Sequence, residues 1–133
     1  MSGRGKETQR AVLSILRETG VALSAYDLLA KLRVTNPTIS APTIYRALAA
    51  LTERGEVHRL ETVNAFAASK HGGIVQGAIV SICDDCGAVE ESAAPALMDE
   101  LSKVAERSGF STTRRLVELH GRCAACDTDQ AKQ

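Results

Sequence analysis

Residues 40–55 read SAPTIYRALAALTERG, and they predict the best-marked helix of the chain. Ser40 suits the position that caps a helix N-terminus, and Pro42 falls in the first turn, where a missing N–H costs little. Gly55 follows the end of the helix, as glycine often does. Three apolar side chains recur at i, i+4 and i+7 and would face one core: Ile44, Leu48 and Leu51. The opposite side of this helix is left for contacts outside the core.

The segments around this helix predict a winged helix-turn-helix. Apolar spacing and turn residues indicate, in order, helices over 6–18 and 24–32, a turn over 34–38, and strands over 56–60 and 65–68. Ser24 and Asp27 form an approximate capping box at the start of the second helix. In this arrangement the helices over 24–32 and 40–55 form the helix-turn-helix pair. The helix over 40–55 enters the major groove of DNA, and the hairpin touches the DNA backbone. The first domain, over 1–68, is therefore predicted to bind double-stranded DNA.

Hydroxyl and guanidinium groups on the exposed side of the third helix suit contacts to phosphates and base edges. We expect the N-terminal turns of this helix to contact DNA, and two flanking arginines to contact phosphates; the predicted residues are Ser40, Thr43, Tyr45, Arg46, Arg54 and Arg59. Helix-turn-helix geometry also occurs in proteins that never touch DNA, and Tyr45 would then be a residue at the rim of the core. Both interpretations are compatible with the pattern alone.

The composition changes at Ser69-Lys70-His71-Gly72-Gly73, a polar stretch with two glycines that predicts a hinge over 69–73. The remaining residues, 74–133, are expected to form a small α/β domain with strands over 74–82, 88–90 and 115–120 and a helix over 94–108. The apolar face of this helix is expected to point inward: Leu97, Met98, Leu101, Val104 and Ala105. The predicted fold class is α+β.

All four cysteines stand in Cys-x-x-Cys pairs, Cys83/Cys86 and Cys123/Cys126, with 36 residues between the pairs. Two residues between thiolates let a tight turn point both sulfurs at one ion, and two such turns complete a tetrahedron. The alternatives are two disulfides or one redox-active dithiol, as in a thiol oxidoreductase. A thioredoxin-type pair lies within a βαβ pattern, whereas these pairs lie between two strands and at the chain end. The spacing favours one structural Zn²⁺ per chain over an enzyme.

Charge and composition set limits on the class of protein. The net charge is zero, but residues 1–63 carry nine Lys/Arg against six Asp/Glu, and residues 64–133 carry seven against ten. The basic first half favours a polyanion as partner. With four aromatic residues and no Trp, a base-stacking platform for single strands is disfavoured. No apolar run approaches the length of a membrane span and no secretory signal is recognisable, so we expect a cytoplasmic protein with no membrane partner.

Several motifs in fixed order resemble the ferric uptake regulator superfamily, and most of all its zinc uptake regulator branch. They are APTIYRAL at 41–48, GEVHR at 55–59, NAF at 64–66, ICDDCG at 82–87, GF at 109–110 and ELHGRCAAC at 118–126. The resemblance runs from about Thr8 to Cys126. It implies a homodimeric repressor, without a small-molecule substrate, that binds an AT-rich inverted repeat upstream of metal-uptake genes. It also implies that Tyr45 and Arg46 meet DNA, that the four cysteines hold the structural zinc, and that 74–133 is the dimerisation domain.

The resemblance further implies a second, regulatory zinc at the hinge, held by two histidines, a cysteine and a glutamate. The matching histidine in the wing is His58 and the matching glutamate is Glu91, but Ser69 stands at the cysteine position and Gln76 at the second histidine position. Serine and glutamine are poor zinc ligands. Two hypotheses therefore stay open. Either His71 joins His58 and Glu91 in a rebuilt sensor, or the chain is a DNA-binding regulator that has lost zinc sensing.

Overall fold

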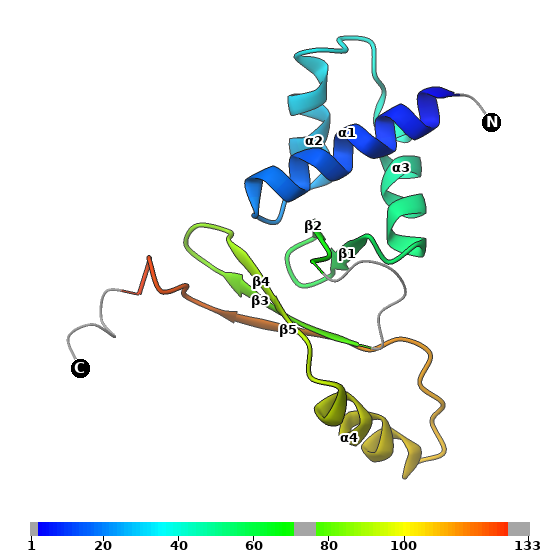
Figure 1. Cartoon of the computed structure of the whole chain (residues 1–133), viewed down its shortest axis with the longest axis vertical. Helices are drawn as coiled ribbons and strands as arrows, with labels where there is room; N and C mark the ends of the chain where they lie inside the picture. Colours follow the sequence, from blue (N-terminus) through cyan, green and yellow to red (C-terminus); the bar gives the residue numbers. More distant parts are fainter. Residues whose placement is uncertain (1–2, 71–76, 128–133) are drawn as a thin grey trace. The chain divides into compact units, whose positions relative to one another are not determined.

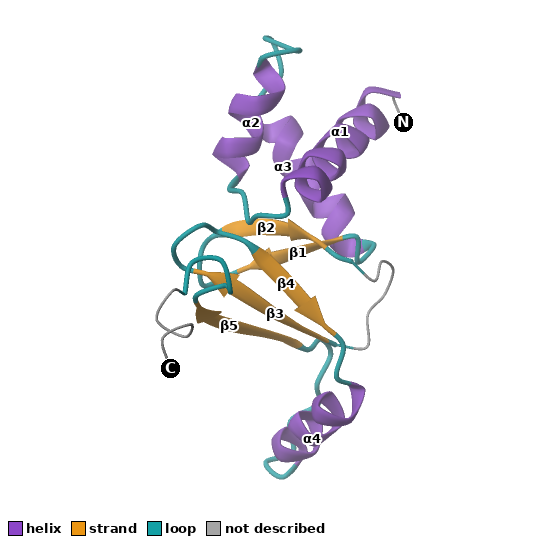
Figure 2. Ribbon diagram, turned by 60° about the vertical axis from the view of Figure 1, so that its left-hand side comes forward, coloured by secondary structure: helices purple, strands orange, loops and turns teal. Residues whose placement is uncertain are grey.

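The computed structural model describes residues 3–70 and 77–127, without the Arg4 side chain. The chain divides into two compact units, Met1–Ile74 and Val75–Gln133 (Figure 1). The first is mainly helical, and the second is a small sheet with one helix (Figure 2). No helix in the described part of the chain is long and apolar enough to cross a membrane.

Within its described residues, the Met1–Ile74 unit consists of three helices and a hairpin, as the sequence predicts. The elements are α1 (Gly3–Thr19), α2 (Ala25–Arg33), α3 (Ala41–Glu53), β1 (Val57–Leu60) and β2 (Ala65–Ala68). β1 and β2 pair antiparallel, with Val57 opposite Ala68 and Leu60 opposite Ala65. Leu23, just before α2, makes a bridge to Phe66, with the two backbone N···O distances at 3.0 and 2.8 Å. This bridge ties the entry to α2 to the wing.

The core of this unit lies where the apolar stripes of the three helices meet. Seven side chains at helical spacing are the main part of it, each at most 7% exposed: Val12, Leu16, Leu28, Leu32, Ile44, Leu48 and Leu51. Val57 of β1 and Phe66 of β2 belong to the same cluster. Because α3 is held on its inner stripe, its outer face is fixed in direction and available for contacts.

The two helix starts differ from each other. At α2 the capping box is complete: the Ser24 hydroxyl accepts from the Asp27 amide at 3.1 Å, and the Asp27 carboxylate accepts from the Ser24 amide at 3.0 Å. At α3 Ser40 occupies the predicted N-cap position, but its side chain makes no cap hydrogen bond. Its hydroxyl lies 2.9 Å from the Thr43 hydroxyl instead. The first-turn amides of α3 are therefore not capped by the Ser40 side chain.

The described part of the Val75–Gln133 unit, residues 77–127, is a three-stranded sheet with one crossover helix. Its elements are β3 (Ala78–Cys83), β4 (Val89–Ser92), α4 (Pro95–Glu106) and β5 (Leu116–Gly121). The strand order is β4-β3-β5, with β4 antiparallel and β5 parallel to the central β3. The parallel pairing needs a crossover, and α4 supplies it. Strand β3 begins at Ala78 rather than at residue 74 as predicted, and residues 74–76 lie outside the described part.

The predicted inward face of α4 is mostly wrong, because only Met98 is buried. Leu97, Leu101 and Val104 are 48%, 42% and 53% exposed, respectively. They share one side of the helix, at i, i+4 and i+7. The sequence pattern correctly marked an apolar stripe, but within this chain the stripe is not covered.

Gly77 controls how closely α4 approaches the start of β3. Its φ is +128°, and a Cβ there would lie 2.6 Å from Met98 Cγ. We expect Gly77→Ala to destabilise the unit by about 2–4 kcal/mol, since it combines backbone strain with overpacking against a fully buried side chain. The free energy of unfolding from urea titrations measures this.

Gly109 provides the matched control for that substitution. Its φ is +80°, and a Cβ there would have nothing within 4 Å. Gly109→Ala should therefore cost only the backbone strain, about 1 kcal/mol. If Gly77→Ala and Gly109→Ala lower the free energy of unfolding equally, the close packing of Met98 on Gly77 contributes nothing to the effect of Gly77→Ala.

Candidate nucleic-acid interface and metal centre

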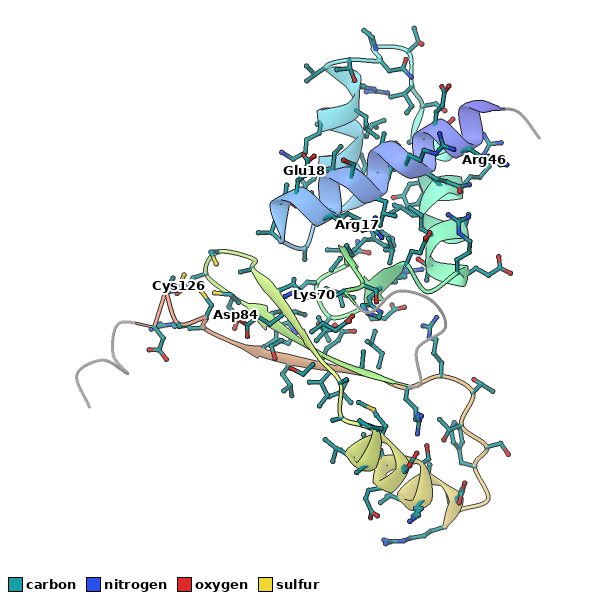
Figure 3. All side chains as sticks on the ribbon, viewed as in Figure 1. Arg17, Glu18, Arg46, Lys70, Asp84 and Cys126 are labelled. Carbon is teal, nitrogen blue, oxygen red and sulfur yellow. The ribbon has the colours of Figure 1, made fainter. Side chains whose placement is uncertain are left out.

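The sheet brings the two cysteine pairs to one end of the Val75–Gln133 unit. β3 ends at Cys83 and β5 ends at Gly121, and these two residues are paired in the parallel ladder. Because parallel strands run in the same direction, the turns that follow them leave the same end of the sheet. The turn after β3 carries Cys86, and the turn after β5 carries Cys123 and Cys126. Figure 3 shows Asp84 and Cys126, one from each turn, at this end.

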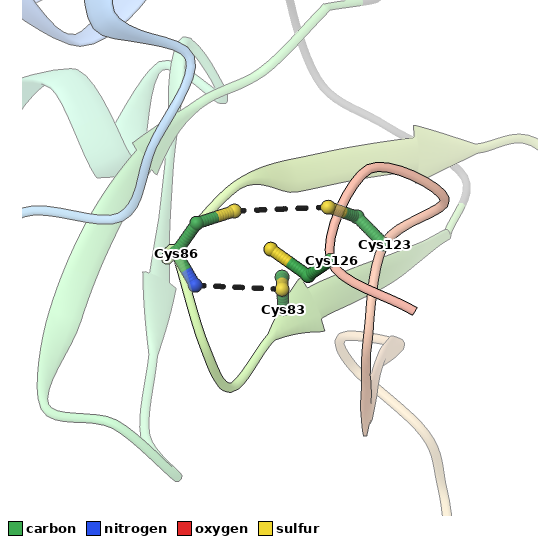
Figure 4. A group of neighbouring side chains, drawn as sticks. All are labelled: Cys83, Cys86, Cys123 and Cys126. Carbon is green, nitrogen blue, oxygen red and sulfur yellow. Dashed lines mark hydrogen bonds between the residues drawn. The ribbon is translucent and has the colours of Figure 1, made fainter. Parts of the chain in front are cut away.

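The four sulfurs converge on one point (Figure 4). All four Sγ atoms lie within 4.8 Å of one another, and those of Cys86 and Cys123 are 3.7 Å apart. With Zn–S bonds of about 2.3 Å, tetrahedral sulfurs lie roughly 3.8 Å from each other. A disulfide would need a separation of about 2.05 Å. The arrangement of the thiols therefore fits a tetrahedral zinc ion, and four sulfur ligands are typical of a closed, structural site.

Backbone hydrogen bonds shape each cysteine turn. The Gly87 amide donates to the Cys83 carbonyl at 3.0 Å, and the Asp127 amide donates to the Cys123 carbonyl at 2.9 Å. In the first turn the Cys86 amide also points at Cys83 Sγ, at 3.5 Å. Amides directed at a sulfur favour the thiolate, which is the form that binds metal.

The pKa values of the thiols diverge because the sulfurs share their protons. The backbone amides of Cys123 and then Cys86 lower the pKa of Cys83 to about 6. Hydrogen bonds to the sulfurs of Cys123, Cys86 and Cys83 stabilise the protonated form of Cys126 and raise its pKa to about 12. The amide of Ala88 favours the Cys86 thiolate, but the thiols of Cys83 and Cys123 outweigh it, so the pKa of Cys86 is raised. At neutral pH and without a cation, the raised pKa values of Cys86 and Cys126 therefore favour their protonated thiols.

The outer face of α3 presents the residues that the sequence assigns to DNA contact. Tyr45 is 52% exposed, and Arg46 extends from the same face, with its Nε donating to the Pro42 carbonyl at 3.4 Å (Figure 3). Ser40 and Thr43 lie one turn earlier, with their hydroxyls 2.9 Å apart. The helix therefore displays hydroxyl, phenol and guanidinium groups together on its N-terminal half.

The two predicted flanking arginines already have partners. Arg54 donates from Nε and Nη2 to Glu56 Oε2, at 3.1 and 2.9 Å, and from Nη1 to Gln9 Oε1 at 2.9 Å. Arg59 Nε lies 3.5 Å from Glu61 Oε1. Exposed ion pairs of this kind contribute little, so either arginine could exchange its partner for a phosphate.

Tyr26 was not predicted from the sequence to have a role, and the structure places it beside Tyr45. Tyr26 is 76% exposed, and it lines a shallow hollow together with Tyr45, Leu29 and Ala41. These are the two tyrosines of the chain. Tyr26 lies two residues after the Ser24 cap and off the leucine stripe of α2. This position is the sequence signal from which its exposure could have been predicted.

Comparison with known proteins decides the family. The model of the ferric uptake regulator family matches residues 4–120, which is most of the chain. The chain belongs to the ferric uptake regulator family. Within this family it falls in the zinc uptake regulator branch, since it is 39% identical over 116 residues to the zinc uptake regulation protein of Escherichia coli K12. That match covers 86% of this chain and 68% of the relative.

Solved structures of the same branch superpose well on the chain. A zinc uptake regulator complexed with zinc and DNA has a TM-score of 0.85 at 37% identity, covering 93% of this chain and 83% of the other. The holo form of XcZur has a TM-score of 0.79 at 34% identity, covering 89% of this chain and 82% of the other. The predicted family and fold class are thereby confirmed.

The residues at the family's regulatory positions are distributed over both units. His58 lies half-buried on β1, opposite Ala67, and Glu91 lies on β4 in the other unit. His71 and Gln76 lie outside the described residues. Ser69 is 4% exposed, and among the described residues its hydroxyl has no hydrogen-bond partner. At the position where zinc-sensing relatives are expected to carry a thiol, this family member thus holds a buried hydroxyl, which is a poor zinc ligand.

Proposed function

We propose that this protein is a zinc-containing transcriptional repressor, which binds an operator in double-stranded DNA as a homodimer and controls metal-uptake genes, zinc uptake in particular. The observation that carries the proposal is the outward face of α3, with Tyr45 and Arg46 exposed on a helix whose opposite face is locked in the core. A relative with the same fold has been solved with zinc and DNA. The protein would act in the cytoplasm, as a regulator rather than an enzyme.

The chemistry of each side chain indicates which group of the DNA it contacts. Arg46 is suited to a bidentate contact with guanine in the major groove, and Thr43 and Ser40 to phosphates or base edges. Tyr26 and Tyr45 together offer an apolar surface with two hydroxyls, suited to a thymine methyl group and a neighbouring phosphate. Arg54 and Arg59 would exchange their carboxylate partners for phosphates.

The test of this proposal is binding to a labelled AT-rich inverted repeat, followed by fluorescence anisotropy at several salt concentrations. Specific binding should exceed binding to a scrambled duplex of the same composition by at least about 1,000-fold. The logarithm of the affinity should fall linearly with the logarithm of salt concentration, as counterions are released. Equal affinity for both duplexes would rule out an operator-binding repressor.

The uncovered apolar stripe of α4 supports dimerisation. Leu97, Leu101 and Val104 are exposed on one side, and β5 lies at an edge of the sheet with Leu119 51% exposed. Exposed apolar stripes and sheet edges are surfaces on which a second chain can pack. A second copy related by a twofold axis would cover both and present two α3 helices to an inverted repeat.

We expect Leu101→Glu to shift the protein from dimer to monomer, because it places a charge in the middle of this stripe. Sedimentation equilibrium of the purified variant measures the change. Lys103→Glu is the control, since it puts the same charge on the exposed polar side of α4. A dimer that survives Leu101→Glu would place the interface elsewhere.

A second candidate function is a DNA-binding regulator that has lost zinc sensing. The observation in its favour is Ser69, a buried hydroxyl at a position where a thiol is expected. The two candidates differ in zinc content. A regulator with a rebuilt sensor from His58, His71 and Glu91 should take up two Zn²⁺ per chain after dialysis against excess zinc, and its operator affinity should rise with the second ion. One Zn²⁺ per chain and no change in affinity would favour the second candidate.

A further inference from the structure

We propose that Asp84 and His120 are positioning residues that hold the two cysteine turns together, so that the four sulfurs meet one zinc ion. The inference rests on the zinc site proposed for the four cysteines. It concerns residues that are not ligands: Asp84 lies inside the first Cys-x-x-Cys pair, and His120 lies three residues before Cys123.

Asp84 contacts the end of β5 twice. Its backbone amide donates to the Gly121 carbonyl at 2.8 Å, and its Oδ1 lies 3.0 Å from His120 Nδ1. A carboxylate can only accept, so Nδ1 of His120 carries the proton and donates it. One residue of the first turn is therefore joined by backbone and by side chain to the strand that leads into the second turn.

An ion pair adds a second connection between the same two segments. Arg122 Nε lies 3.4 Å from Asp85 Oδ2, so both residues between Cys83 and Cys86 contact the segment just before Cys123. Both aspartates come from the first turn, whereas His120 belongs to β5 and Arg122 directly follows this strand. Two side-chain contacts thus link the first turn to the segment that leads into the second.

The sheet cannot fix the sulfurs by itself. The β3–β5 ladder ends at the pair of Cys83 with Gly121, so the turns that carry Cys86, Cys123 and Cys126 project beyond the last paired residues. Only Cys83 lies within the ladder. Contacts across the turns are needed to place the other three sulfurs, and groups that orient metal ligands typically change metal affinity by about 10–100-fold.

The charge of Asp84 cannot explain a favourable effect on zinc binding, so its role is to position the cysteine turns. Four thiolates around one Zn²⁺ leave a net negative charge, and a carboxylate next to Cys83 adds to it. A carboxylate at this place therefore weakens retention of the cation through space, unless the contact it makes outweighs the repulsion. Positioning and charge thus make opposite predictions for Asp84→Ala, which should weaken zinc binding if the contact matters and strengthen it if only the charge matters. They also differ for Asp84→Asn, which keeps Oδ1 as an acceptor but removes the charge: positioning predicts an unchanged zinc affinity, and charge alone predicts a higher one.

The experiment measures zinc affinity of the full chain by competition with a chromophoric chelator, and the d–d absorption of the Co²⁺ form as a signature of tetrahedral sulfur ligation. Asp84→Ala and His120→Ala should each weaken zinc binding by about 10–100-fold. The double variant should bind zinc no more weakly than either single variant, because the two substitutions remove the same contact. The zinc affinity of Asp84→Asn and of His120→Asn should stay close to that of the wild type. Asparagine at position 84 keeps an acceptor oxygen in the place of Oδ1, and asparagine at position 120 brings a donor nitrogen near the place of Nδ1.

Glu100→Ala is the matched control, because it removes an exposed carboxylate that pairs with Lys103 at 3.6 Å on α4. It should leave zinc affinity unchanged. A wild-type chain that binds no zinc would overturn both the zinc site and the positioning role. A zinc-binding wild type whose Asp84→Ala and His120→Ala variants match Glu100→Ala would overturn only the positioning role, as would losses that multiply in the double variant.

Discussion

Replacing Cys123 with serine is expected to unfold the Val75–Gln133 unit while the Met1–Ile74 unit stays folded. The sheet unit is small, α4 contributes only Met98 to its buried interior, and small domains depend on such staples. Structural zinc supplies apparent binding energies of about 10–16 kcal/mol that couple to folding. The helical unit has its own cluster of buried side chains and needs no metal.

Hydrogen exchange followed by mass spectrometry measures this outcome for each unit. Protection should be lost from β3, β4 and β5 and retained in α1 and α3, and removing zinc with a chelator should produce the same pattern in the wild type. Ala125→Ser is the control, because it adds a hydroxyl at an exposed place in the same turn. A folded sheet in Cys123→Ser would mean that the thiols do not hold the metal that stabilises this unit.

Local signals in the sequence predicted the helical unit well. The Ser24–Asp27 box starts α2 where expected, and strand β2 spans Ala65–Ala68 as the pattern indicated. These features depend on residues within a few positions of one another, so a single sequence is enough to place them. Ser40 likewise occupies the predicted N-cap position of α3, although its hydroxyl lies beside that of Thr43 instead of capping the helix.

Features that depend on a second element or a second chain were harder to predict. An apolar stripe at helical spacing indicates that one face of a helix is covered, but it does not identify the element that covers it. In α4 the side chains of this stripe, Leu97, Leu101 and Val104, are exposed within the chain. The effect of Gly77 requires knowing that Met98 passes over it. Both cases need tertiary or quaternary contacts that spacing along the chain does not contain.

The candidate sites show the same contrast. Cys-x-x-Cys spacing encodes its own turn, so the convergence of four sulfurs could be predicted from the sequence. The contact of Arg54 with Gln9 joins residues 45 positions apart, and the hollow shared by Tyr26 and Tyr45 joins two helices. The position of Tyr26 off the leucine stripe indicates that it is exposed, but neither pairing can be predicted from a single sequence, because the partners are brought together only by the packing of α1, α2 and α3.

Arg46→Ala is expected to weaken operator binding by roughly 10- to 100-fold, because a bidentate contact to a base is worth about 1–3 kcal/mol. The side chain is exposed on α3 and bonded only weakly to its own helix, through Pro42 at 3.4 Å. Arg114→Ala is the control for loss of one positive charge, since Arg114 is an exposed arginine of the other unit. It should lower affinity slightly and equally for operator and scrambled duplex.

Arg46→Lys separates base recognition from phosphate contact. Lysine keeps the charge but lacks the planar fork of guanidinium, so it can replace a phosphate contact but not a bidentate contact to guanine. If Arg46 reads a base, Arg46→Lys should retain affinity for the scrambled duplex and lose most of the preference for the operator. If the preference is unchanged in Arg46→Lys, Arg46 binds a phosphate, and sequence recognition lies with Tyr26, Tyr45 or the shape of the AT-rich tract.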